Sequence, residues 1–578
     1  MEHKEYKGKM SDKTMSPRFD IAKCPFSRFG SYFSLSIIGW GELGKGLYLH
    51  THHGKSPRAF RIDPVRDGEV LEFETHATPS QLTLKPAGGG EVAFVISGKG
   101  TVRVRGRGVS LRLEMPKERW TTACELPGGV WGFNMSCHGV QLALERLSGK
   151  LSVDAPWEKG KGFCHESSRM VAVLAPDADG TFEAAIDEFV TTWIPRPRPA
   201  FDACRAEVAQ EYALWTKGLP EVAPQYEPAR DLAGYVNWSA TVDPKGYLTR
   251  QTMLMSKMGM CNVYHWDHVF NAMAHCRHNP DLAWDQFMVM SDRQDAYGKC
   301  PSSMNDRDIR YTFANPPVHG WAFRRIWDEN PGMMTPERLI EAYEYLSKWS
   351  DWLCNHWTWP GDVLPFYTHG FDSGWDNSTI FDQGVPVVTP DLAGYLVLQL
   401  EVLADIAHAI NKEAHAAVWR QRSDGMLKAL VETLWKRDRF VGMRRPCGKI
   451  VECESLITCM PMVLGRRLPE HVRTALVARI REHLTPWGLA TEKLSSVKYM
   501  ENGYWRGPIW APSTMLIVTG LLDIGQDELA KTIVRAFCRM CVDNGFHENF
   551  DARTGVGHYD TAYTWTSSVF MIFANRYV

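Results

Sequence analysis

The most restrictive feature of the sequence is its texture from residue 229 to residue 578. Segments of roughly 12 to 20 residues with helical periodicity alternate there with loops rich in Gly, Pro, Asn and Trp. Residues 392–410 and 413–434, for example, each place apolar side chains on one helical face. At roughly 29 residues for one helix and its loop, this part predicts about twelve helices. That number indicates an (α/α)6 barrel, whose inner ring leaves a loop-lined funnel at one end.

The first part of the chain has a different texture, made of short apolar runs separated by Gly, Pro, Asp and Asn. Residues 91–97 are one such run, and residues 101–105 alternate apolar and basic side chains. A turn at Gly106-Arg-Gly108 leads into residues 109–114, so the pattern predicts a β-hairpin with one solvated face. Further runs up to residue 174 favour an antiparallel β-sandwich.

Three parts are therefore expected. A β-sandwich-like N-terminal domain is expected over residues 1–194, a linker with one helix over 195–228, and the barrel over 229–578. The linker opens with Pro195-Arg-Pro-Arg-Pro199, which is stiff and extended, and its helix is expected at 201–215. The expected fold class is mainly α, an (α/α)6 barrel preceded by an antiparallel β-sandwich.

Charge and cysteine content exclude several classes of protein. The 65 Lys and Arg against 67 Asp and Glu give a net charge of −2, which does not attract nucleic acid or anionic lipid. The 14 scattered cysteines show no disulfide or zinc-knuckle spacing and fit a reducing compartment. The first residues lack a signal-peptide pattern, and no stretch reaches the roughly 18 apolar residues of a membrane span. We expect a cytoplasmic protein with no nucleic-acid partner and no membrane association, while the oligomeric state is left open.

One loop combines carboxylates with an aromatic ring. Gly370-Phe-Asp-Ser-Gly-Trp-Asp-Asn-Ser378 places Asp372 and Asp376 beside Trp375. Burial against an aromatic wall raises the pKa of a carboxyl group, and a general acid near neutral pH needs such a shift. The other interpretation is a helix cap made by the Asp-Asn-Ser triplet.

A second candidate carboxylate stands in Gly545-Phe-His-Glu-Asn-Phe550. His547 and Asn549 flank Glu548 and could keep it ionised and oriented, as a general base for water requires. An exposed turn before the last helix is the alternative interpretation of the same residues.

Aromatic residues gather in the segment 501–510, in a chain of which 11% is Phe, Trp or Tyr. The segment holds Tyr504, Trp505, Arg506 and Trp510. Such rings stack on the C–H faces of a sugar while hydroxyl, indole and guanidinium groups bind its hydroxyls. Rings that only plug one end of the barrel are the alternative.

The segment Tyr264-His-Trp-Asp-His268 also combines rings with polar groups. Asp267 beside Trp266 suits a clamp for sugar hydroxyls. His265 and His268 have the spacing of metal ligands, but no second cluster of ligands completes a site. We therefore expect no metal and no other cofactor. The motifs of serine nucleophiles, phosphate loops and dinucleotide sites are absent from the sequence.

In this order, the segments resemble the trehalase and processing α-glucosidase clan of glycoside hydrolases, families 37 and 63, which includes bacterial glycosylglycerate hydrolases. The resemblance covers about residues 230–578. Tyr504-Trp-Arg-Gly-Pro-Ile-Trp510 matches the pattern Y-W-R-G-P-x-W without a gap. The remaining resemblances are those of 264–267 to the W-D segment, 298–301 to G-x-x-P, 315–321 to Q-P-P-x-x-x-W, 372–378 to the acid loop and 547–550 to the base loop.

The resemblance implies that the barrel is a catalytic domain with an inverting mechanism. Asp376 would be the general acid and Glu548 the general base, with their carboxyl groups roughly 6.5 to 9.5 Å apart. The residues expected around the released sugar are Tyr264, Trp266, Asp267, Gly374, Trp375, Tyr504, Trp505, Arg506, Trp510 and Trp565. The expected activity is that of an exo-acting α-glycosidase, foremost an α-glucosidase, on a small carbohydrate substrate. Asp372 and Asn315 depart from the usual Glu and Gln of the clan.

Two other functions stay open. An inverting glycoside phosphorylase would use phosphate in place of water and would not need Glu548, and a non-catalytic sugar-binding protein would need neither carboxylate. Arg277, Arg293 and Arg307 are candidate contacts for an anionic leaving group, although surface placement is the simpler interpretation of each.

Overall fold

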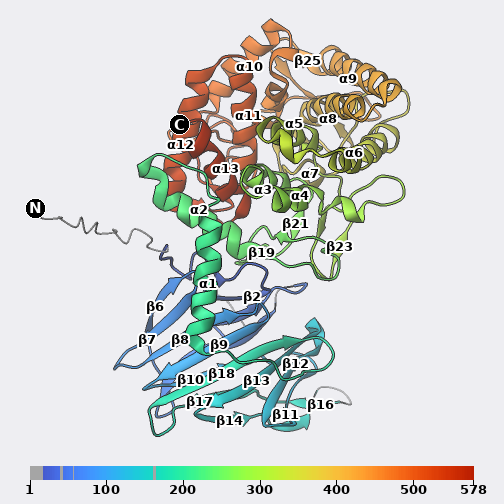
Figure 1. Cartoon of the computed structure of the whole chain (residues 1–578). Coiled ribbons are helices and arrows are strands. Elements are labelled where there is room, and N and C mark those ends of the chain that lie inside the picture. The colour runs from blue at the N-terminus through green and yellow to red at the C-terminus, as the bar shows by residue number, and fades with distance from the viewer. Residues whose placement is uncertain (1–16, 40–42, 56, 161–163) are drawn as a thin grey trace, which may run out of the picture.

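The computed structural model describes residues 17–39, 43–55, 57–160 and 164–578. Figure 1 shows two parts, β-sheets formed by the first third of the chain and helices formed by the rest, with helix α1 running along the sheets toward the helical part. The N-terminal residues from which we expected no signal peptide lie outside the described residues.

The β part consists of two eight-stranded antiparallel sheets around one apolar core. In the first sheet the strand order is β1 (Phe26–Ser27), β2 (Phe33–Ile38), β3 (Gly46–Thr51), β4 (Arg58–Arg66), β10 (Ser110–Glu114), β17 (Val171–Ala175) and β14 (Lys150–Asp154), with β5 (Glu69–Val70) on β4. In the second it is β11 (Thr121–Leu126), β12 (Val130–Met135), β13 (Val140–Ser148), β18 (Thr181–Phe189), β9 (Thr101–Arg107), β8 (Glu91–Ser97), β7 (Gln81–Pro86) and β6 (Phe73–Thr78). The expected antiparallel β-sandwich is confirmed.

The hairpin expected across Gly106-Arg-Gly108 is wrong. Strand β9 pairs with β8 and β18, whereas β10 pairs with β4 and β17 in the other sheet. The solvated face is also wrong, because Arg103 is only 2% exposed and pairs with Glu183 at 2.8 Å. Helix α1 (Phe201–Thr216) covers this face, and its Phe201 ring contacts the Arg105 guanidinium. One side of β9 therefore packs against the sandwich core, and the other side packs against the linker helix.

The helical part is a closed double ring. The inner ring runs through α3 (His268–His275), α5 (His319–Glu329), α8 (Pro390–Ala409), η6 (Leu456–Arg467), α11 (Ala511–Asp523) and α13 (Thr564–Arg576), and α13 packs back against α3. The outer ring is α2 (Glu227–Ala240), α4 (Pro280–Met288), α6 (Pro336–His356), α9 (Glu413–Leu434), α10 (Glu470–Glu482) and α12 (Asp527–Asn544). The expected (α/α)6 barrel is confirmed, including helices over 392–410 and 413–434 within two residues of their observed ends.

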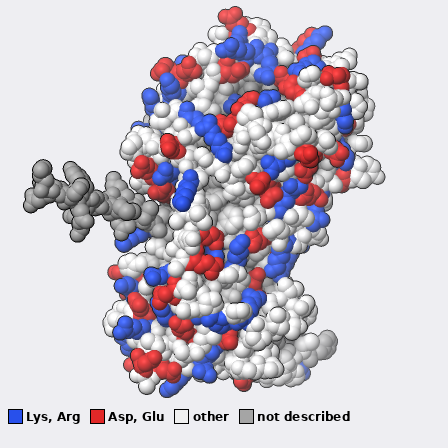
Figure 2. Space-filling view, in the orientation of Figure 1, with Lys and Arg blue, Asp and Glu red and all other residues white. Residues whose placement is uncertain are grey.

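Two inner-ring elements have special local chemistry. Element η6 is a 3₁₀ segment because Pro461 stands inside it and Gly465, with φ of 53°, breaks it. Helix α8 is the one described helix that is long and apolar enough to cross a membrane, although we expected no such stretch, and 78% of its apolar window is buried in the barrel, as for a core helix. Basic and acidic side chains are interspersed over both parts of the molecule on the face shown in Figure 2.

Short elements occupy the loops of the barrel. They are α7 (Gly370–Ser373) and the strand sets β19 (Thr241–Val242) with β20 (Thr252–Met253), β21 (Val263–Tyr264) with β22 (Ser303–Met304) and β23 (Ile309–Arg310), β24 (Val387–Val388) with β27 (Gly442–Arg444) and β28 (Ile450–Val451), β25 (Trp435–Lys436) with β26 (Arg439–Phe440), and β29 (Asn549–Phe550) with β30 (Gly557–His558). In the β part, β15 (Trp157–Lys159) pairs with β16 (His165–Ser167).

The division of the chain into residues 1–194, 195–228 and 229–578 stays a proposal. The end of β18 at Phe189 and the start of α1 at Phe201 support it.

The inner ring depends on a close approach between α5 and α8 at Gly320. A Cβ atom at this position would lie 2.2 Å from the Gln399 Cα atom, which belongs to the backbone and cannot rotate away. We predict that Gly320→Ala lowers the free energy of unfolding by about 1 to 3 kcal/mol through overpacking, measured by urea denaturation.

Gly425 provides the matched control. It lies on the exposed face of α9, and a Cβ there would meet nothing within 4 Å. Gly425→Ala should therefore raise the free energy of unfolding by about 0.5 to 1 kcal/mol, because alanine restricts the unfolded chain and favours helix. Equal denaturation midpoints for Gly320→Ala and the unchanged protein would contradict the packing described.

Candidate active site

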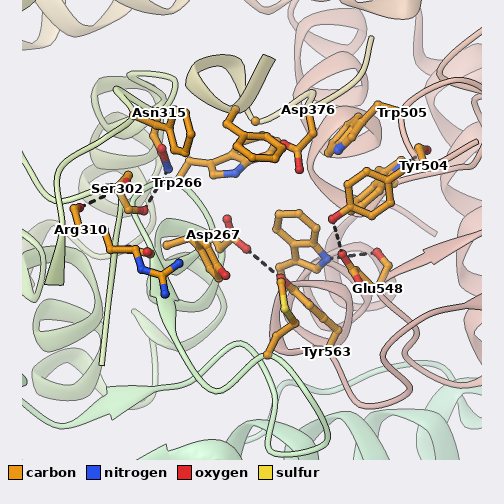
Figure 3. Close-up of a pocket in the computed structure, with 18 of the residues that line it drawn as sticks. Trp266, Asp267, Ser302, Arg310, Asn315, Asp376, Tyr504, Trp505, Glu548 and Tyr563 are labelled. Atoms are coloured by element: carbon orange, nitrogen blue, oxygen red, sulfur yellow. Dashed lines mark hydrogen bonds between the residues drawn. The ribbon is translucent and has the colours of Figure 1, made fainter. Parts of the chain in front are cut away.

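A cavity of about 230 Å³ opens among the loops that precede the inner helices (Figure 3). Its wall comes from loops that lead into α3, α5, α8, α11 and α13, so it lies at the N-terminal ends of five inner-ring helices. The lining residues are Met260, Tyr264, Trp266, Asp267, Ser302, Ser303, Arg310, Thr312, Phe313, Asn315, Phe371, Gly374, Asp376, Tyr504, Trp505, Trp510, Glu548, Tyr563 and Trp565. Sites for drug-sized ligands hold about 300 to 1,000 Å³, so this cavity suits a small molecule.

Packed indole rings form one wall of the cavity. Trp505 and Trp510 stack with ring centroids 4.0 Å apart and an interplanar angle of 9°. Trp565 meets Trp510 edge-on at 5.6 Å and Trp266 at 5.5 Å. Trp510 Nε1 donates to the Tyr504 carbonyl oxygen at 2.9 Å. Because each ring holds the next, the wall is rigid and presents apolar surface to the cavity.

Asp376 lies at the cavity wall just after the single turn α7. A capping box between His369 and Asp372 holds this turn, and Asp372 also accepts hydrogen bonds from the Ala314 amide at 2.8 Å and the Thr368 amide at 2.7 Å. Asp372 is thus buried, with both oxygens hydrogen-bonded, and does not line the cavity. Burial raises the pKa of Asp376 to about 6.

Glu548 lines the same cavity from the segment between α12 and α13, directly before strand β29 (Figure 3). The Tyr504 hydroxyl donates to its Oε1 at 2.7 Å. Burial raises the pKa of Glu548 to about 7, with the carboxylates of Asp560 and Asp376 adding to the rise and the Tyr504 hydrogen bond opposing it. The expectation that the two flanking side chains hold Glu548 is wrong, since the partner comes from a different loop.

A third carboxyl group, that of Asp267, lines the cavity beside Trp266. It is 2% exposed, and the Tyr563 hydroxyl donates to its Oδ2 at 3.2 Å. Burial raises its pKa well above the usual value for an aspartate. A buried carboxyl group with an adjacent hydroxyl can both accept from and donate to the hydroxyls of a ligand.

The structure brings eight of the ten expected sugar-contacting residues to the cavity and places two elsewhere. Trp375 is fully buried behind the wall, with its ring 4.7 Å from that of Trp505. Arg506 donates to the Asn377 carbonyl oxygen at 2.7 Å and pairs with Asp382 on the outer side of the loop. Neither lines the cavity, because Trp375 packs behind Trp505 and the turn at 503–506 directs Arg506 toward Asn377 and Asp382.

The arginines expected near an anionic ligand also lie elsewhere. Arg277 pairs with Glu329, Arg293 donates to the backbone of Tyr247, and Arg307 donates to the backbone of the β-sandwich. A different residue, Arg310 on β23, lines the cavity on the side of Asp267 (Figure 3). Its place between the two matched segments 298–301 and 315–321 was the only sequence signal for it.

Behind the cavity, His265 and His268 gain a third histidine, His319 of α5. The candidate ligand atoms lie within 4.8 Å of one another, all three rings are buried, and no described Cys, Asp or Glu joins them. His268 Nδ1 lies 2.5 Å from the Gln286 carbonyl oxygen, its Nε2 lies 3.0 Å from His319 Nε2, and His265 Nε2 lies 2.8 Å from the Tyr345 hydroxyl. Burial lowers the pKa of all three imidazoles, so they are neutral. The trio fits a hydrogen-bonded core, and the lack of a metal stays a prediction.

Known proteins resemble this chain in sequence and in fold. The model of a domain described as mannosylglycerate hydrolase MGH1-like glycoside hydrolase matches residues 260–566. A mannosylglycerate hydrolase of Rubrobacter radiotolerans is 22% identical over 407 residues, which are 53% of this chain and 89% of that protein.

Two solved structures share the fold. The family 63 mannosylglycerate hydrolase from Thermus thermophilus in complex with Tris and D-glycerate aligns with 18% identity and a TM-score of 0.52, over 61% of this chain and 100% of that chain. A bacterial glucoamylase complexed with acarbose aligns with 9% identity and a TM-score of 0.60, over 97% of this chain and 94% of that chain. The second alignment therefore includes both the sandwich and the barrel.

Proposed function

Because the chain belongs to the family of mannosylglycerate hydrolase MGH1-like glycoside hydrolases, we propose that it is an exo-acting inverting α-glycosidase for a small α-glycoside. An α-glucoside is the leading substrate, and an α-mannoside is the alternative that the names of the relatives suggest. We also propose a cytoplasmic location, which the scattered cysteines support.

The observation that carries the proposal is the pair of carboxyl groups, Asp376 and Glu548, on separate loops of one aromatic-walled cavity. Burial raises the pKa of both. Inverting glycosidases need such a pair, one group on each side of the scissile bond with room for a water between the sugar and the base.

In the proposed reaction, Asp376 gives its proton to the glycosidic oxygen as the bond to the anomeric carbon breaks. Glu548 takes a proton from a water that attacks the opposite face of that carbon, so the configuration inverts. The indole wall excludes bulk water and offers apolar surface to the C–H face of the sugar. Asp267 and Tyr563 are placed to bind the sugar hydroxyls.

The pair needs one proton, on Asp376. The Tyr504 hydroxyl favours this arrangement, because its hydrogen bond to Glu548 Oε1 stabilises the ionised form of Glu548. Burial still leaves the pKa of Glu548, about 7, above that of Asp376, about 6, so the reactive form with its proton on Asp376 is the less populated one and Tyr504 limits this bias.

Arg310 supports a leaving group that carries a carboxylate. Its guanidinium belongs to the cavity wall, and guanidinium groups bind carboxylates with two parallel hydrogen bonds. The Thermus hydrolase in complex with D-glycerate has the same barrel fold. Glycerate α-linked to one hexose is therefore the substrate class that we propose.

The catalytic assignment predicts the effect of two conservative substitutions. Asp376→Asn and Glu548→Gln should each lower kcat by about 10² to 10⁴-fold, because each removes a proton-transfer group, while KM changes only a few-fold. Steady-state hydrolysis of glucosylglycerate and mannosylglycerate measures both constants.

Glu501→Gln is the matched control for these variants. Glu501 is an exposed carboxylate near Tyr504 that does not line the cavity, so this variant should keep normal constants. If Asp376→Asn or Glu548→Gln turned over substrate at the normal rate, the role assigned to that residue would be wrong.

The Tyr504 hydrogen bond predicts a change in pH dependence. The unchanged enzyme should show a bell-shaped kcat/KM profile, since activity needs Glu548 ionised and Asp376 protonated. Tyr504→Phe removes the donor and raises the pKa of Glu548 further above that of Asp376, so less of the enzyme carries its one proton on Asp376. The loss of kcat/KM should be at least about tenfold on the acidic side of the profile, because a hydrogen bond to a charged group contributes about 1.5 to 3 kcal/mol, and it should fade toward alkaline pH. A uniform loss at every pH would contradict this role of Tyr504.

A further inference from the structure

The β-sandwich lies outside the part of the chain that matches the family. That match begins at residue 260, and the Thermus hydrolase aligns over its whole length with 61% of this chain. The contacts of the sandwich with the barrel show where it can act on the site.

One contact reaches the hairpin that carries Arg310. Strands β22 and β23 pair Ser303 with Arg310 and Met304 with Ile309, and both Ser303 and Arg310 line the cavity. Residues 305–308 form the tip of this hairpin, directly between Met304 and Ile309. The sandwich binds this tip.

The hairpin tip is held by several hydrogen bonds from the sandwich. Asp306 accepts from the Gly54 amide at 2.9 Å and lies 2.7 Å from His53 Nδ1. Asn305 Nδ2 donates to the Gly54 carbonyl oxygen at 3.1 Å, and Arg307 donates to the Gly139 carbonyl oxygen at 3.0 Å. Three consecutive residues of the tip are thus fixed from outside the barrel.

His53 is the centre of this attachment. Its Nε2 lies 2.8 Å from Glu188 of strand β18, and its ring stacks on Tyr32 with centroids 4.4 Å apart. The side chains of His53 and Asp306 are each 2% exposed. Lys245 of the barrel completes the cluster at 3.2 Å from Glu188. Because the His53 ring is buried and contacted at both nitrogens and on one face, it can hold Asp306 in one position.

Arg310 itself is weakly held. Its side chain is 62% exposed, and its ion-pair partner Asp308, at 3.4 Å, is on the same hairpin and is itself exposed. Fixing the hairpin before the ligand arrives removes part of the entropy cost of ordering Arg310 on binding.

We propose that His53 and Asp306 are positioning residues through which the β-sandwich holds Arg310 ready for the carboxylate of the leaving group. This rests on the proposed function, in which Arg310 contacts that carboxylate. The sandwich would then set which leaving groups the barrel accepts, while the proton-transfer groups belong to the barrel alone.

The test compares two substrates with the same hexose, one linked to glycerate and the other to glycerol, which lacks the charge. His53→Ala should raise KM for the glycerate compound about tenfold with little change in kcat, and should change kcat/KM for the glycerol compound less than twofold. Asp306→Asn, which keeps the shape of the side chain and can still accept from the Gly54 amide, should act in the same direction. His76→Ala is the matched control, since His76 is a half-exposed histidine of the same sandwich, and both constants should stay normal.

A double-substitution cycle separates positioning from general destabilisation. If His53 acts through Arg310, then His53→Ala should add nothing to the defect of Arg310→Gln on the glycerate compound. Multiplied defects, or equal losses on both substrates for His53→Ala and Asp306→Asn, would overturn the inference. If Arg310→Gln discriminates between the substrates but His53→Ala and Asp306→Asn do not, the inference alone fails. If Arg310→Gln does not discriminate, the carboxylate part of the proposed function fails with it. Thermal unfolding of each variant shows whether it is folded at the assay temperature.

Discussion

Burial of ionisable carboxyl groups against packed indole rings is the constraint on which the site depends. Asp376 and Glu548 are removed from water by the stacked pair Trp505 and Trp510 and their neighbours, and this desolvation raises the pKa of both carboxyl groups toward neutral pH. Such burial is costly, so the surrounding structure must be rigid. The inner helices provide that rigidity, because each cavity loop leads directly into one of them.

The architecture separates two tasks. The barrel brings the proton-transfer groups and the aromatic wall together from loops before five inner helices. The sandwich contacts the barrel beside a different part of the cavity wall, where His53 meets Asp306 at the tip of the hairpin that carries Arg310. In this account the sugar side of the reaction depends on the barrel, and the leaving-group side depends on the contact between the two parts.

Local patterns predicted the elements well where one neighbour decides the burial of a face. Helix α9 follows from apolar periodicity, because it buries one face, whereas α8 follows from its long apolar sequence, because it is buried on nearly every side. The alternation in β9 was misleading, since a linker helix distant in sequence covers its basic face. Periodicity separates the two faces of a strand but does not show which elements cover them, so neither the burial of Arg103 nor the pairing of β10 with the other sheet could be predicted.

The site was predictable to a similar extent. The two carboxylates and eight of ten sugar-contacting residues reach one cavity, since short motifs combined aromatic and acidic residues in a recognisable order. The partner of Glu548 and the place of Arg310 depend on which loops lie close together in the fold, and sequence spacing does not show this.

The most direct test of inverting hydrolysis is proton NMR of the anomeric signals while an α-linked glycosylglycerate is hydrolysed, without and then with phosphate. The free sugar is expected to appear first as its β-anomer, without phosphate. First appearance of the α-anomer, or of a sugar phosphate only when phosphate is present, would contradict inverting hydrolysis.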